Sequence, residues 1–78
     1  MNCAEHKPTL RTISVLEQIS AGNNKYTLSE LSRTLNIPPS TLLPIVRTLR
    51  EHQYLNFDEV SQTYSIGIRL FEIATRLQ

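Results

Sequence analysis

Apolar residues recur at helical spacing early in the chain, between residues that start and stop helices. Pro8 suits the first turn of a helix, and Gly22 supplies a stop. The apolar face between them consists of Leu10, Ile13, Leu16 and Ile19. This spacing predicts a first helix over about 9–21.

A second, shorter helix is predicted over about 28–35. Thr27 is followed three residues later by Glu30, which is the sequence of a capping box: hydroxyl and carboxylate each accept a hydrogen bond from an otherwise unpaired N–H. Leucines at 28, 31 and 35 then share one face. Asn36 can take the left-handed conformation that ends helices, and two prolines follow, so the chain turns sharply and restarts.

A third helix is predicted over about 39–52. Its inward stripe consists of Leu42, Ile45, Val46 and Leu49, and its outward face of Ser40, Leu43, Pro44 and Arg47. Pro44 lacks the N–H that the Ser40 carbonyl needs, and its ring crowds that carbonyl. Because the apolar stripe continues through Pro44, we predict one helix with a local bend.

The last third of the chain predicts a hairpin and the start of a fourth helix. Residues 54–57 and 63–66 are rich in aromatic and β-branched side chains, and the polar stretch between them can close a hairpin. After Gly67, helical spacing returns at Leu70, Phe71, Ala74 and Leu77. No residue after Leu77 signals a helix end, so this helix is expected to continue in a longer protein.

The order of these elements predicts the fold class. Seventy-eight residues with 40% apolar content make one small domain, spanning 1–78. Three helices, the last two joined by a tight turn and followed by a hairpin, are the order of a winged helix-turn-helix. We therefore expect a mainly α fold with a small β-hairpin: a helix-turn-helix at about 28–47, a wing at about 54–66 and a linker helix from 68.

Five separated segments carry a family resemblance. They are Leu10-Arg11-Thr12-Ile13, Leu28-Ser29-Glu30-Leu31, Ile37-Pro38-Pro39-Ser40-Thr41, Thr48-Leu49 and Tyr64-Ser65-Ile66-Gly67. In this order they resemble the DNA-binding domain of the IclR-type bacterial transcription regulators, over almost the whole chain. The resemblance implies that the third helix enters the major groove of double-stranded DNA. It also implies a longer parent, a homo-oligomer whose C-terminal domain, absent here, binds a small-molecule effector.

The sequence departs from that family's pattern at two positions. Pro44 stands where the family commonly has an Arg on the exposed face of the third helix, and Gln53 stands where a Gly commonly precedes the wing. The base contacts of that Arg are therefore not transferred to this chain.

The distribution of charge indicates DNA binding independently of the resemblance. Net charge is only +1, but residues 25–50 hold four basic residues and one acid. The candidate DNA-contacting residues are Lys25, Thr27, Arg33, Pro39, Ser40, Thr41, Leu43, Pro44, Arg47 and Arg50. Among them, Ser40 and Thr41 suit phosphate or base edges, Leu43 a thymine methyl, and Arg47 a phosphate or guanine. Lys25, Thr27 and Arg33 are expected to touch backbone, and the start of the third helix to offer N–H groups and a positive dipole to a phosphate.

Each of these roles has a plainer alternative. Arg47 can be a solvated arginine or the partner of Glu51, Thr27 is more simply a helix cap, and Leu43 can be exposed or buried without touching a base. The aromatic residues Tyr54, Phe57 and Tyr64 favour packing over nucleic-acid stacking. The predicted wing loop, 58–62, holds two acids and no base, so no backbone clamp is assigned to it.

Other classes of function have little support. Cys3, His6, His52 and Asp58 lack the paired spacing of a metal site, and neither a phosphate-binding loop nor a nucleophile elbow occurs, so neither cofactor nor enzyme activity is expected. The lone Cys, the absence of an apolar leader and an apolar run of only 42–46 favour a cytoplasmic protein with no membrane span. The rival interpretation is a winged helix that contacts protein through the apolar faces of its first and fourth helices, without DNA.

Overall fold

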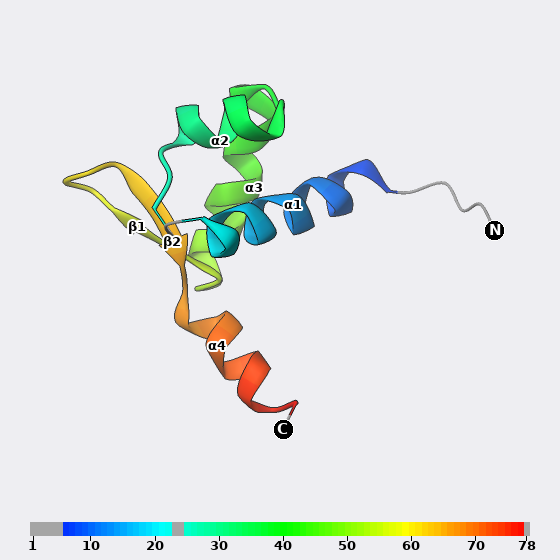
Figure 1. Ribbon diagram of the computed structural model, residues 1–78, viewed down its shortest axis with the longest axis vertical. Helices are drawn as coiled ribbons and strands as arrows, with labels where there is room; N and C mark the ends of the chain where they lie inside the picture. Colours follow the sequence, from blue (N-terminus) through cyan, green and yellow to red (C-terminus); the bar gives the residue numbers. More distant parts are fainter. Residues whose placement is uncertain (1–5, 23–24, 78) are drawn as a thin grey trace.

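The computed structural model describes residues 6–22 and 25–77, and within them the chain forms four helices and one two-stranded antiparallel hairpin (Figure 1). Their order is α1 (Lys7–Ala21), α2 (Leu28–Leu35), α3 (Pro39–Glu51), β1 (Leu55–Asp58), β2 (Thr63–Ile66) and α4 (Ile68–Thr75). The predicted winged helix-turn-helix is confirmed.

Helix α1 begins two residues earlier than predicted and ends at the predicted residue. His6 is its N-cap, and the His6 carbonyl accepts a hydrogen bond from the Leu10 N–H at 3.0 Å, which brings Lys7 into the first turn. Pro8 lies in that first turn, where its missing N–H removes no helical bond. Gly22 closes the helix, its N–H donating to the Gln18 carbonyl at 3.2 Å.

The capping box of α2 is present with both of its hydrogen bonds. The Glu30 N–H donates to Thr27 Oγ1 at 3.1 Å, and the Thr27 N–H donates to Glu30 Oε1 at 2.9 Å. At the other end Asn36 adopts φ 57° and ψ 45°, the predicted left-handed conformation. The Ser32 hydroxyl then donates to the Ile37 carbonyl at 2.6 Å, which holds the turn into α3.

One core joins all elements except α4. Helix α1 packs against β2 and α2, while α3 packs against α2 and β1. The buried residues are Val15, Ile19, Leu31, Ile37, Leu42, Val46, Leu49, Leu55 and Tyr64. Three of the four residues predicted for the inward stripe of α3 are therefore buried, and Ile45 is half-buried at its edge.

The hairpin has a third strand-like partner that the sequence pattern missed. β1 and β2 pair from Leu55↔Ile66 to Asp58↔Thr63. On the other side of β2, Tyr26 forms an isolated antiparallel bridge with Tyr64: the Tyr64 N–H donates to the Tyr26 carbonyl at 2.7 Å, and the Tyr26 N–H donates back at 3.1 Å. The segment that enters α2 is thereby fixed to the wing.

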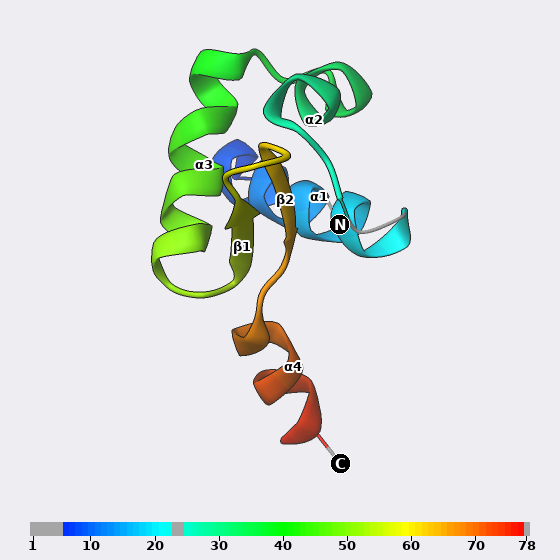
Figure 2. The ribbon, with the colours of Figure 1, turned by 90° about the vertical axis from the view of Figure 1, so that its left-hand side faces the viewer.

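Helix α4 leaves the body of the domain, with no buried residue of its own (Figure 2). Phe71 is 64% exposed, and Ile68 and Leu77 are exposed as well. Across the residues that the structure describes, each helix is too short or too polar to traverse a lipid bilayer.

Candidate nucleic-acid interface

Helix α3 passes through Pro44 without a break, as predicted. The helix runs over Pro39–Glu51 with Pro44 inside it, and the proline ring is exposed. The carbonyl of Ser40 therefore faces a residue without an N–H, on the side of the helix where water can bind it. The local bend at Pro44 stays a prediction.

The exposed side of α3 carries one cation that no carboxylate engages. Ser40, Pro44 and Arg47 are all exposed, at the spacing of one helix face. Within the described part of the chain the only ion pairs are those of Arg50 and Arg69, so the alternative pairing of Arg47 with Glu51 is not formed. The guanidinium of Arg47 is thus available to a ligand that approaches this face.

The first turn of α3 offers fewer free donors than expected. Pro38 and Pro39 have no N–H, and the N–H groups of Thr41 and Leu42 both donate to the Pro38 carbonyl, at 3.0 and 2.9 Å. Of the first-turn amides, Ser40 alone has its N–H free for an incoming group. We expected several free N–H groups for a phosphate at this helix start, but the first turn offers one, the Ser40 N–H, next to the Ser40 hydroxyl.

Two residues predicted for the DNA-contacting surface are turned partly inward. Leu43 is half-buried and packs against the core, because it lies only about 100° around the helix from buried Leu42. Thr41, on the other flank, is also half-buried. The placement of Leu43 on the outward face was therefore wrong: it belongs to the edge of the core stripe.

The predicted backbone-contacting residues occupy different environments. Lys25 and Arg33 are exposed, and Arg33 lies in the last turn of α2. The hydroxyl of Thr27 accepts the capping bond from Glu30, so the plainer interpretation of Thr27 as a helix cap is confirmed. Pro39 is the first residue of α3 and is exposed.

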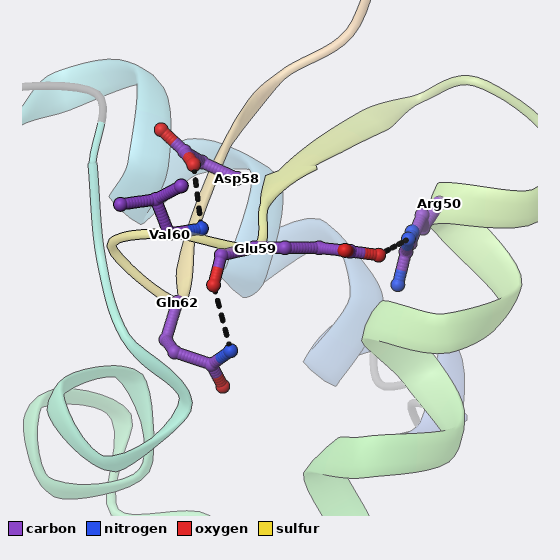
Figure 3. A network of polar contacts seen from close by, with 5 residues as sticks. All are labelled: Arg50, Asp58, Glu59, Val60 and Gln62. Carbon is purple, nitrogen blue, oxygen red and sulfur yellow. Dashed lines mark hydrogen bonds and ion pairs between the residues drawn. The ribbon is translucent and has the colours of Figure 1, made fainter.

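Arg50 lies three residues beyond Arg47 on α3, about 60° around the helix, but the hairpin engages its guanidinium. Its Nη2 lies 3.7 Å from Glu59 Oε2, and its guanidinium carbon lies 4.8 Å from the centroid of the Phe57 ring. Figure 3 shows Glu59 reaching from the wing to Arg50. Sequence reasoning missed this contact because Glu59 and Arg50 belong to separate elements.

The wing turn is fixed by its own polar groups. Asp58 Oδ1 accepts the Val60 N–H at 2.9 Å, the Asp58 carbonyl accepts the Gln62 N–H at 2.7 Å, and Gln62 Nε2 donates to the Glu59 carbonyl at 3.0 Å. Gln62 adopts φ 59°, which closes the turn. The hydrogen bonds from the backbone of Val60, then of Ser61, together with the charge of Lys25, lower the pKa of Asp58, so this carboxylate is ionised near neutral pH.

The predicted aromatic packing is confirmed. Tyr64 is buried, and Tyr54 and Phe57 pack against the core as half-buried residues. The rings of Phe57 and Tyr64 lie 4.7 Å apart between centroids, at an interplanar angle of 48°. The aromatic residues of the wing therefore serve in packing.

Comparison with protein families settles the class of this domain. Residues 8–59 match the model of the IclR helix-turn-helix domain. The chain belongs to the IclR helix-turn-helix family. The matched range runs from the first turn of α1 to the wing turn, so it contains α2, α3 and all of the residues predicted to contact DNA.

Solved structures of IclR regulators share the fold of this IclR domain. An IclR transcriptional regulator from Alicyclobacillus acidocaldarius matches with a TM-score of 0.90 and 25% identity, over 95% of this chain and 30% of that one. An IclR family transcriptional regulator from Brucella abortus matches with a TM-score of 0.83 and 21% identity, over 92% of this chain and 28% of that one. The chain thus spans about 30% of the regulator from A. acidocaldarius. No curated protein matches the chain.

The family is one of DNA-binding domains of transcription regulators and not a family of enzymes. Among the described residues, no three His, Cys, Asp or Glu side chains gather as they would around a metal ion. Cys3, considered and rejected as a metal ligand from the sequence, lies outside the described residues.

Proposed function

We propose that this IclR domain binds double-stranded DNA in a sequence-specific manner, with α3 in the major groove. The observation that carries the proposal is the free guanidinium of Arg47 on the exposed face of α3. An α-helix fits the major groove, and an arginine there can bind guanine O6 and N7 with two hydrogen bonds. In this proposal Arg47 reads a base, or contacts a phosphate, at the centre of the interface.

The residues around Arg47 complete the proposed contact surface. Ser40 places a hydroxyl and a free N–H at the start of the same helix, suited to a phosphate oxygen. Lys25 and Arg33, both exposed, contribute phosphate contacts that position the domain without reading sequence. Thr27 shapes α2 as its cap, and Thr41, Leu43 and Pro44 provide the surface around Arg47.

A titration of duplex DNA against salt tests the proposal. Sites bound by the domain are first selected from random duplexes, and affinities are then measured for a selected and a generic duplex by fluorescence anisotropy. Arg47→Ala is expected to cost about 1 to 3 kcal/mol on the selected site. Lys25→Ala and Arg33→Ala should weaken both duplexes alike, each lowering the slope of log affinity against log salt by about 1.

Arg76→Ala is the matched control, because it removes the same charge from the end of α4, outside the proposed interface. Its affinity should equal that of the parent chain. Unchanged affinity of Arg47→Ala for the selected site would remove Arg47 from the interface, and binding that does not respond to salt would contradict the proposal as a whole.

A second candidate function is a protein contact through α1 and α4. The observation that favours it is the exposed apolar surface of these helices, where Leu16, Ile66, Leu70 and Phe71 line one shallow hollow. An apolar interface need not weaken as salt rises, whereas phosphate contacts must. The same titration, with sedimentation in parallel, therefore separates the two functions.

For the longer parent protein, we infer a cytoplasmic regulator that works as a homo-oligomer and binds its small-molecule effector through a C-terminal domain. The resemblance to full-length IclR regulators supports this inference. Dimeric winged helices bind paired half-sites, so we expect the isolated domain to bind one half-site weakly and to dimerise only at high concentration. A tight dimer at low micromolar concentration would contradict the expected weak dimerisation and leave the proposed DNA binding standing.

A further inference from the structure

One acid of the wing pairs with one of the four cations in the basic segment. Glu59 Oε2 lies 3.7 Å from Arg50 Nη2. The side chains of the two wing acids point in different directions from the wing turn, Glu59 toward α3 and Asp58 away from it (Figure 3). Among the contacts that the structure describes, Lys25, Arg33 and Arg47 form no ion pair.

Glu59 is held in this position by the turn that presents it. The hydrogen bonds that fix the turn come from Asp58 and Gln62, on either side of Glu59 and Val60. Arg50 is held from the other side, with its guanidinium over the Phe57 ring, and that ring packs on buried Tyr64. Both partners are thus brought together by the fold of the wing and α3, while their charged groups stay 80% and 46% exposed.

An exposed pair of this kind adds little to folding stability. Its effect on an approaching polyanion is different, because a phosphate that binds Arg50 competes with Glu59 for its guanidinium. The Glu59 carboxylate also repels that phosphate at close range. A cation already neutralised inside the protein releases no counterion from DNA, so it adds nothing to the salt dependence of binding.

We propose that Glu59 is an intramolecular competitor of DNA phosphate for Arg50, so that the wing weakens generic DNA binding by this domain and leaves recognition to Arg47. The inference rests on the proposed function and adds a residue that sets the affinity of the domain for generic DNA. In the free domain Arg50 is paired with Glu59, and a duplex gains this phosphate contact only when the pair separates.

Glu59→Gln tests the inference by removing one charge and keeping nearly the same shape. We expect the variant to bind a generic duplex more tightly, with a slope of log affinity against log salt steeper by about 0.9, the value of one added phosphate contact. The gain in affinity should therefore be about 3.5-fold larger at about 50 mM than at about 200 mM salt.

Glu72→Gln is the matched control. Glu72 is also an ion-paired glutamate, 3.8 Å from Arg69, but it lies on α4, so the substitution changes net charge equally without touching the wing. Its salt slope should equal that of the parent chain. Thermal unfolding of each variant verifies that the fold is kept, and Glu59→Ala replaces Glu59→Gln if the latter fails to fold.

A double-mutant cycle identifies the cation involved. Arg50→Gln alone should leave the salt slope unchanged, because Glu59 already neutralises Arg50. In the Glu59→Gln background, Arg50→Gln should remove the whole gain. A parent chain without salt-dependent duplex binding would overturn the proposed function and this inference with it. Equal slopes for Glu59→Gln and Glu72→Gln, with the parent binding DNA, would overturn this inference alone.

Discussion

Gly67 joins β2 to α4 at a place where the structure has no room for a side chain. Its backbone angles, φ −90° and ψ 169°, suit any residue, so conformation does not require glycine here. Space does: an added Cβ would lie 2.9 Å from the carbonyl carbons of Gln53 and Tyr54, and closer still to the Gln53 carbonyl oxygen. Gly67→Ala therefore forces these two backbone segments apart.

The expected cost follows from the bonds that tie the segments together. The Gly67 N–H donates to the Tyr54 carbonyl at 2.9 Å, and the Arg69 N–H donates to the Gln53 carbonyl at 3.1 Å. Weakening two bonds worth about 0.5 to 1.5 kcal/mol each outweighs the 0.4 to 1 kcal/mol, roughly, that Gly→Ala gains through the unfolded chain. We expect a net loss of about 0.5 to 2.5 kcal/mol in the free energy of unfolding.

Thermal and urea unfolding, followed by circular dichroism, measure this loss. In a domain of this size it corresponds to a melting temperature lower by about 2 to 20 °C. Gly22→Ala is the control, because the added Cβ there meets the ring of Tyr26, a side chain that can turn away at the cost of its 3.1 Å hydrogen bond with Gln18. If Gly67→Ala melts at or above the parent, the close approach of Gly67 to Gln53 does not exist as described.

Two further substitutions test α3 and the wing turn. Pro44→Arg is expected to stabilise the domain by up to about 3 kcal/mol and to strengthen generic DNA binding through one added charge. Pro44→Ala separates the two effects, because it removes the proline without adding a charge. A melting temperature below that of the parent would mean that the bend at Pro44 is part of the packing. The pKa of Asp58 is lower in the folded chain than in the unfolded chain, so its ionisation stabilises the fold. This stabilisation is complete above the pKa of the unfolded chain and is lost as pH falls through the pKa of the folded chain. We therefore expect unfolding midpoints to decline below about pH 4 in the parent and less in Asp58→Asn, and equal declines would refute this role of Asp58.

The helices were predictable because their signals are local. The capping box of Thr27 and Glu30 and the left-handed Asn36 lie within four residues of the ends they define. The stripe of α3 fixed its orientation well enough to place Arg47 outside and Val46 inside. Each of these signals depends on neighbours in sequence, so the pattern alone was sufficient.

The features that the sequence did not predict depend on residues far apart in the chain. Tyr26 pairs with Tyr64 through one bridge, too short to produce an alternating pattern. The neutralisation of Arg50 by Glu59 requires the wing to turn toward α3, which composition cannot indicate. Leu43 was misplaced for a third reason: it lies about 100° around the helix from buried Leu42, at the edge of the stripe, where packing against neighbours decides how far a side chain is buried.

The bridge between Tyr26 and Tyr64 also has a consequence for how the domain folds. It closes a chain loop that contains α2, α3 and β1, so forming the bridge costs the conformational entropy of closing that loop. Because α2 and α3 are local structures, they can form early, while their docking waits for the hairpin. The helix-turn-helix therefore depends on the hairpin, and since α1 packs against α2 and β2, we expect that a stable unit for transfer into another protein runs from α1 through β2.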